Sequence, residues 1–165
     1  MPAPLLTGLF NALWLLSVAG GNTGALLCLP LEIYWLYQCH NTRRLRILLF
    51  GGTGFLFDSL LIITQQLQTP NMPFWLLNIW YLFFMLMPDL LQPLRKIPGL
   101  LSLIAAVAAP LAYYAGSQLS DLQATPLAYI IISIFWAMLL PFALDIYHAR
   151  SVSAVVKQQF ASAGR

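Results

Sequence analysis

Six apolar segments, separated by short polar breaks, run through almost the whole chain. A helix needs about 20 mainly apolar residues, with a range of roughly 17–25, to cross the hydrocarbon core of a bilayer. The segments fall near that length, and the pattern therefore predicts an all-α fold, a polytopic membrane helical bundle with six transmembrane helices. The expected spans cover about residues 4–20, 24–39, 47–66, 74–92, 99–117 and 127–147.

Composition excludes the main alternative, a water-soluble domain. Hydrophobic residues make up 60% of the chain and charged residues only 8%, whereas a soluble domain has roughly 25% charged residues. The apolar segments must therefore face lipid, which makes the bilayer the expected partner. The net charge of +3 comes from cations in short interhelical segments and the tail, a pattern that sets membrane orientation and does not indicate nucleic-acid binding.

The positions of the basic residues predict the topology. Lys and Arg are enriched in cytoplasmic loops of membrane proteins. The segment after the second span, the segment after the fourth span and the C-terminal tail hold all eight basic residues, and the other three loops hold none. This alternation fits six spans with the N- and C-termini both in the cytoplasm, and an odd number of spans would break it. The basic residues are Arg43, Arg44, Arg46, Arg95, Lys96, Arg150, Lys157 and Arg165.

Two connecting regions carry further expectations. Gly20-Gly21-Asn22-Thr23 predicts a tight hairpin between the first two spans, because glycine adopts backbone conformations that other residues avoid. The tail, residues 148–165, places valines and Phe160 on one helical face, which favours an interfacial helix on the inner leaflet; a frayed tail is the alternative. The Ala-rich span at 99–117 is expected at the centre of the bundle, because small residues allow close backbone approach.

Ionisable groups inside a span are costly, by roughly 2.5–3.5 kcal/mol for Asp at a helix centre, and they usually face the bundle interior. At 1.5 Å of rise per residue, Asn11, Glu32 and Asp58 all fall about 12–13 Å below the outer boundary. Asn78 lies on the polar stripe of the fourth span. The candidate intramembrane polar site is therefore Asn11, Glu32, Asp58 and Asn78.

No Lys or Arg lies within an expected span, so the two mid-membrane carboxyl groups have no basic partner at their depth. They could form interhelical hydrogen bonds and act only in packing, or they could bind a cation or a cationic substrate. Secondary polar residues lie near the inner boundary, where ion pairs with nearby basic residues would explain them; these residues are Asp89, Asp145 and His148. Four prolines lie inside spans, namely Pro30, Pro88, Pro110 and Pro141. They are expected to shape helix packing; the alternative is that they kink helices and free backbone carbonyls for a site.

Common catalytic and cofactor-binding patterns are missing. The sequence has no phosphate-binding glycine loop of the βα type, no Gly-x-Ser-x-Gly elbow, and no paired ligands at zinc spacing. Its two cysteines are expected to be small packing residues. The sequence therefore predicts no metal, no other cofactor and no nucleic-acid partner, and it favours a protein that is not an enzyme.

Several short motifs resemble a small proteobacterial family of integral inner-membrane proteins that is classed as a domain of unknown function. The resemblance covers about residues 5–145, and Asp58 is the ionisable residue that matches its pattern well. It implies a multi-pass protein of the bacterial inner membrane and no known activity. The motifs are Gly54-Phe55-Leu56-Phe57-Asp58-Ser59, Pro73-Phe74-Trp75 with Trp80, and Pro110-Leu111-Ala112-Tyr113 with Gly116.

Three functions remain open on the sequence. The first is binding or transport of a small ligand, ion or lipid through the intramembrane polar layer. The second is an accessory or scaffold subunit of a lipid-linked membrane system, with a homo-oligomer or a membrane protein as partner. The third is an enzyme acting on a lipid, with Glu32 or Asp58 as the acid or base.

Overall fold

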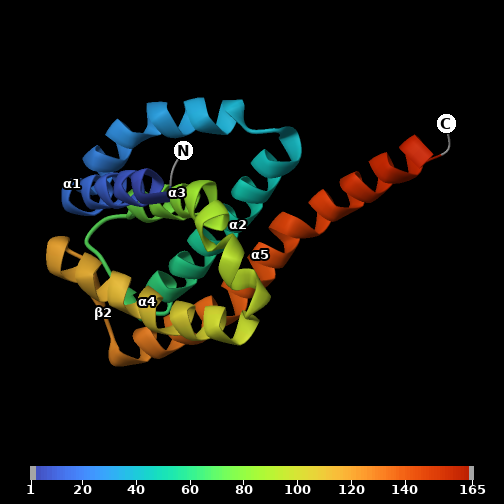
Figure 1. Ribbon diagram of the computed structural model, residues 1–165. Helices are drawn as coiled ribbons and strands as arrows, with labels where there is room; N and C mark the ends of the chain where they lie inside the picture. The colour runs from blue at the N-terminus through green and yellow to red at the C-terminus, as the bar shows by residue number, and fades with distance from the viewer. Residues whose placement is uncertain (1–2, 164–165) are drawn as a thin grey trace.

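A computed structural model describes the backbone of residues 3–163 and the side chains of residues 4–147. Within residues 3–163 the chain forms five α-helices, one short 3-10 helix and two strands of two residues each (Figure 1). Their bounds are α1 Ala3–Gln38, α2 Asn41–Ile63, β1 Leu67–Gln68, α3 Phe74–Leu91, η1 Gln92–Lys96, α4 Pro98–Leu119, β2 Gln123–Ala124 and α5 Pro126–Ala163.

The fold is all-α, and five of its helices are long and apolar enough to cross a membrane. The first of them, Pro4–Gln38, covers both of the first two expected spans. The other four are Asn41–Ile63, Phe74–Lys96, Pro98–Leu119 and Pro126–Tyr147.

Helix α1 folds back on itself at Gly21, which has φ 55° and ψ −142°. The Ser17 Oγ and Cys28 Sγ atoms lie 3.5 Å apart although the residues are separated by 11 positions, whereas a straight helix would place them about 16 Å apart. A Cβ atom on Gly24 would collide with the carbonyl group of Leu16. Helix α1 is therefore a tight hairpin of two limbs, residues 3–20 and 22–38.

Helix α3 is the most enclosed helix of the bundle. Half of the residues in the most apolar stretch of α3 are buried, whereas only 17% of those in α4 are buried. Helix α3 packs against α1 on one side and α2 on the other, and α4 packs mainly against α5. The expectation that the Ala-rich helix sits centrally is wrong, because α3 carries the large aromatic side chains whose burial stabilises the core.

The three loops without Lys or Arg meet at one end of the bundle. Strands Leu67–Gln68 and Gln123–Ala124 pair antiparallel there, so the loop after α2 lies beside the loop after α4 (Figure 1). At the hairpin turn, Asn22 Nδ2 donates to the Met72 carbonyl oxygen (3.0 Å), and the Trp75 backbone N–H donates to Asn22 Oδ1 (3.3 Å). These contacts tie the α1 turn to the loop between α2 and α3, and the strand pair ties that loop to the one after α4.

Pro88 shows how a helix break is compensated. A proline within a helix has no N–H, so the carbonyl four residues earlier loses its usual helical donor. In α3 that carbonyl belongs to Phe84, and the Tyr147 hydroxyl of α5 donates to it at 3.0 Å. Helix α5 therefore supplies the hydrogen bond that the proline removes from α3.

Pro110 is compensated in the same way. It leaves the Ala106 carbonyl of α4 without a helical donor, and the Ser133 hydroxyl of α5 donates to that oxygen at 2.6 Å. The carbonyls that these prolines free therefore account for two contacts of α5, and both contacts hold helices together. An apolar medium offers no water to replace such bonds.

Helix α5 continues beyond the expected last span as far as Ala163. Its last part projects away from the other helices (Figure 1). Residues 164–165 and the side chains of residues 148–163 lie outside the described residues, and with them His148 and the apolar face expected for the tail.

The hairpin in α1 generates a stability prediction that rests on two neighbouring glycines. We expect Gly21→Ala to lower the free energy of unfolding by about 1–3 kcal/mol, because its backbone lies where a side chain is strained. Gly20→Ala is the matched control, since Gly20 is helical and a Cβ there meets nothing within 4 Å. Thermal unfolding in detergent, followed by circular dichroism, measures both. Equal unfolding temperatures for the two variants would contradict the hairpin.

Candidate functional site

Asp58 of α2 is fully buried and holds three helices together. Its Oδ2 atom accepts a hydrogen bond from Trp80 Nε1 of α3 at 2.6 Å, and its Oδ1 atom accepts one from the Tyr113 hydroxyl of α4 at 2.5 Å. Both carboxyl oxygens therefore have a donor, and both donors are uncharged. These two hydrogen bonds join α2 to α3 and to α4.

The position of Trp80 depends on a small residue beside it. Gly54 lies one helical turn before Asp58, and a Cβ atom there would collide with the Trp80 indole. The same indole stacks on Trp136 of α5, with ring centroids 4.6 Å apart and an interplanar angle of 7°. The pair of Gly54 and Asp58 thus fixes one indole, and that indole orients a second one.

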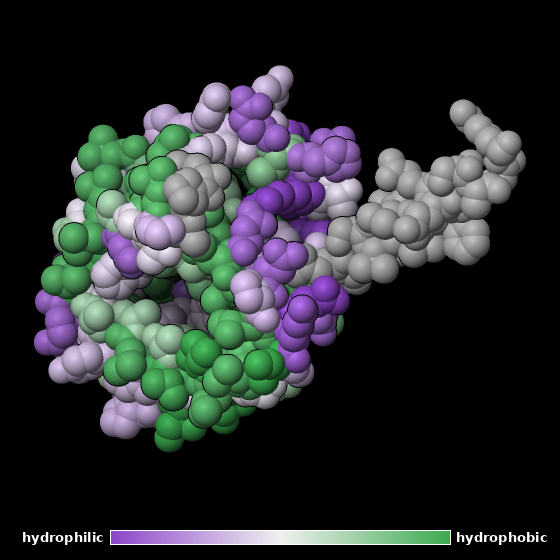
Figure 2. Space-filling model, in the orientation of Figure 1, coloured by the Kyte–Doolittle hydropathy of each residue, from purple (hydrophilic) through white to green (hydrophobic). Residues whose placement is uncertain are grey.

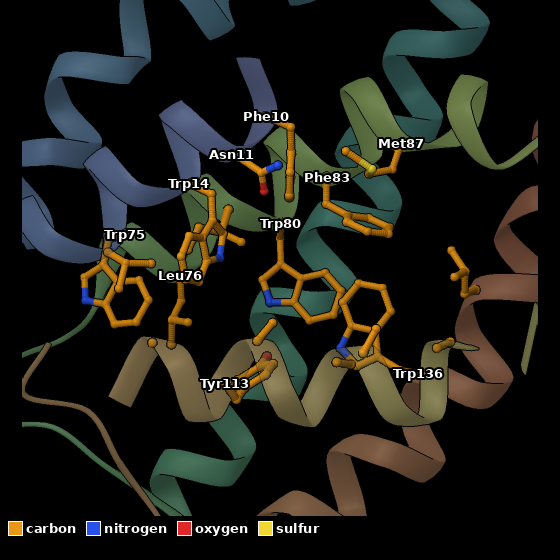
Figure 3. A pocket seen from close by; sticks show the side chains of 18 of the residues that line it. Phe10, Asn11, Trp14, Trp75, Leu76, Trp80, Phe83, Met87, Tyr113 and Trp136 are labelled. Carbon is orange, nitrogen blue, oxygen red and sulfur yellow. The ribbon is translucent and has the colours of Figure 1, made fainter. Parts of the chain in front are cut away.

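An apolar cavity of about 400 Å³ lies next to this aromatic cluster. Helices α1, α3, α4 and α5 form its walls, and Figure 2 shows a hollow between the α1–α3 side and the α4–α5 side of the molecule. Its size falls within the range of about 300–1,000 Å³ that is usual for ligand pockets. The aromatic residues on its walls are Phe10, Trp14, Trp75, Trp80, Phe83, Tyr113 and Trp136 (Figure 3).

A few polar groups face this apolar cavity. Asn11 of α1 contributes an amide on one side, and Tyr113 lies on the other side, with Trp80 between them (Figure 3). The buried Trp136 Nε1 lies beside the Tyr113 hydroxyl but has no hydrogen-bond partner among the described residues. A mostly apolar cavity with a few placed polar groups is typical of small-molecule binding sites.

Glu32 and Asn78 form a second, separate polar cluster between the α1 hairpin and α3. Asn78 Nδ2 donates to Ser17 Oγ at 2.7 Å, and Ser17 Oγ lies 3.5 Å from Cys28 Sγ. Glu32 lies beside Asn78, and both residues are at least 96% buried. Glu32 Oε1 and Asn78 Oδ1 have no hydrogen-bond partner among the described residues.

The secondary polar residues lie at the opposite end of the bundle from the paired loops. Asp89 forms an ion pair with Arg43 at 2.6 Å, and Asp145 forms one with Arg95 at 3.0 Å. All four side chains are more than a third exposed in the structure, and exposed pairs contribute little stability in water. These contacts explain the two aspartates without a ligand.

The predicted site residues do not converge on one cavity. Asn11 lines the apolar cavity, Asp58 lies behind Trp80 and Tyr113, and Glu32 with Asn78 forms the second cluster. The sequence did not identify Trp80 and Tyr113 as the donors of Asp58, because helical periodicity gives the face on which a residue lies and not its neighbour on another helix. A usable signal was present: a carboxyl group in spans without Lys or Arg requires neutral donors, and indole and phenol groups can supply them.

Within the part of the chain whose side chains are described, no three His, Cys, Asp or Glu residues gather as a metal site would require. The residues that line the apolar cavity offer recognition by shape, aromatic contact and a small number of hydrogen bonds. The apolar cavity is the candidate functional site.

The Glu32 cluster generates a prediction that separates packing from ion binding. Glutamine carries both a donor and an acceptor, so Glu32→Gln can pair with Asn78 in either orientation of its amide. We expect Glu32→Gln to unfold at a higher temperature than Glu32→Leu, by the equivalent of about 1–3 kcal/mol, because only the glutamine amide can donate to the unpaired Asn78 Oδ1 atom.

Thermal unfolding of both variants in the same detergent measures the difference. An equal loss of stability in the two variants would show that the carboxylate charge itself is required, and would support a cation site at Glu32.

Comparisons with known proteins place the chain in a family without assigning an activity. No curated protein and no solved structure matches it. The family described as "Protein of unknown function (DUF2878)" matches residues 5–142, which is most of the 165-residue chain. This chain therefore belongs to that family, whose function is unknown.

Proposed function

We propose that this protein is a multi-pass membrane protein that binds a lipid-like small molecule in the apolar cavity beside Trp80 and Trp136. The observation that carries the proposal is the cavity itself, about 400 Å³ in volume and lined by residues of four helices. Binding, with or without transport, is the function that such a cavity supports best.

Six spans with both termini in the cytoplasm are part of this proposal. Each limb of α1 holds 17 or 18 residues on either side of Gly21, which corresponds to about 26 Å of helix and approaches the roughly 30 Å hydrocarbon core of a bilayer. The two limbs would then be two spans, and α2 to α5 the other four.

Charge supports the orientation. Asn22 and the two short strands lie at the end without Lys or Arg. At the other end, the guanidinium groups of Arg43 and Arg95 pair with aspartates, and Arg46 donates to the Tyr147 carbonyl. Lys and Arg mark the cytoplasmic side, so the paired loops would face outward. With the resemblance to an inner-membrane family, this favours the bacterial inner membrane.

The walls of the apolar cavity suggest the chemistry of the ligand. No Lys, Arg, Asp or Glu belongs to the described residues that line it, so a charged group inside would lack a counter-charge and would be costly to bury. The flat rings of Trp80 and Trp136 suit an alkyl or isoprenoid chain. Accessory-subunit and lipid-enzyme roles stay predictions, and the cavity favours ligand binding over both.

The proposal predicts that filling the cavity abolishes binding. Ala108 lines the cavity and Val107, its neighbour on α4, does not. We expect Ala108→Trp to weaken photo-crosslinking by a diazirine-bearing monoacylglycerol about tenfold or more. This corresponds to a loss of roughly 1.4 kcal/mol or more of binding free energy. Val107→Trp, which adds the same side chain on the exposed face, should leave it unchanged.

The measurement is mass spectrometry of the crosslinked peptides from protein in lipid nanodiscs. Wild-type crosslinks should fall on residues of α1 and α3 that line the cavity, such as Trp14 and Phe83. Crosslinks confined to the outer surface, with the same yield in both variants, would refute the proposed function.

A further inference from the structure

We propose that the apolar cavity and a second, polar cavity form one two-part site for a single-chain amphiphile, with a headgroup that donates hydrogen bonds and carries no negative charge. The hydrocarbon chain of the ligand would occupy the apolar cavity, and its headgroup would occupy the polar cavity. This inference rests on the proposed function and specifies its ligand.

The polar cavity lies at the end of the bundle where the loops without Lys or Arg meet. It has a volume of about 380 Å³. Its walls come from three separate loops, namely the α1 turn, the segment before α3 and the segment after α4. The loop residues that line it are 19–22, 69–73 and 119–122.

The two cavities share one boundary. Val18, Trp75 and Leu122 line both of them. These three side chains are no more than 7% exposed, so the boundary lies inside the protein. In the proposed site, a molecule that occupies both cavities would cross this boundary in contact with the three side chains.

The order of the cavities matches an amphiphile in a bilayer. The polar cavity lies among the loops, and the apolar cavity lies deeper, between the helices. Apolar chain in the interior and polar headgroup at the interface is the arrangement that the hydrophobic effect imposes on lipids themselves. A ligand of this kind would keep the same orientation in the site as in the surrounding leaflet.

Headgroup chemistry follows from the hydrogen bonds already made in the polar cavity. The Thr69 hydroxyl donates to the Asn71 carbonyl, and the Ser120 hydroxyl donates to the Gly116 carbonyl. Both hydroxyl protons are thus used within the protein. The Ser120 oxygen also accepts from the Leu122 N–H, so the remaining capacity of the two hydroxyls is for accepting hydrogen bonds. Asn22 uses one of its two amide N–H groups and one oxygen lone pair in its bonds to Met72 and Trp75.

The charge of the polar cavity points the same way. Asp121 is an exposed carboxylate on its wall, and no Lys, Arg or His belongs to the described residues lining either cavity. A phosphate or carboxylate headgroup would face acceptors and a negative charge without a cation to compensate. A hydroxyl or amine headgroup could donate to the same atoms.

The test compares two lipids that differ only in a phosphate, a monoacylglycerol and the lysophosphatidic acid with the same chain. Each competes against the diazirine-bearing monoacylglycerol on the full protein in nanodiscs. We expect the monoacylglycerol to compete at about tenfold lower concentration, equivalent to roughly 1.4 kcal/mol, and Asp121→Asn to narrow that difference. Equal competition by the two lipids would overturn the inference.

A second variant separates this inference from the proposed function. Asn71→Trp narrows the polar cavity from an exposed loop position, and Gln68→Trp, also exposed but outside the cavity, is its control. Asn71→Trp should weaken binding of the monoacylglycerol. It should leave unchanged the binding of an isoprenoid hydrocarbon that carries the same diazirine and has no headgroup. Equal binding of both probes to both variants would refute the two-part site alone, whereas failure of every probe to bind wild-type protein would refute the proposed function as well.

Discussion

The buried carboxyl group of Asp58 is the constraint around which the bundle is arranged. A polar group of this kind is costly to bury unless donors surround it, and here an indole from α3 and a phenol from α4 meet its two oxygens. Those bonds hold Trp80 against Gly54 and Trp136. One wall of the apolar cavity therefore exists because a polar group in α2 has to be satisfied.

Much of the architecture could be predicted from local chemistry. The lengths of the apolar segments predicted helices at the places where they occur, and the glycines at 20 and 21 marked the turn of α1 because only glycine readily adopts its backbone angles. The pairing of side chains between helices could not be predicted, since helical periodicity gives the face of a residue but not its neighbour. Thus Asn11, Glu32 and Asp58 were predicted at one depth, and the structure places them in two separate clusters and on a cavity wall.

The prolines and aromatic residues illustrate the same limit. The freed carbonyls of Phe84 and Ala106 were foreseeable from Pro88 and Pro110, but their donors on α5 were not. Tryptophan and tyrosine suit both membrane boundaries and buried hydrogen bonding, and sequence alone does not distinguish these roles. The two-part site arises only once the loops and helices are assembled, because Val18, Trp75 and Leu122 come from three separate segments.

A double-mutant cycle between Asp58→Leu and Tyr113→Phe, measured by reversible unfolding in detergent, tests the role of the carboxyl group most directly. In the wild-type background, Tyr113→Phe removes the donor to Asp58 Oδ1 and should cost about 1–3 kcal/mol. In the Asp58→Leu background it removes a hydroxyl that has lost its acceptor, so the same substitution should be neutral or stabilising. Equal effects in the two backgrounds would show that the two side chains do not interact, and would contradict the organising role of Asp58.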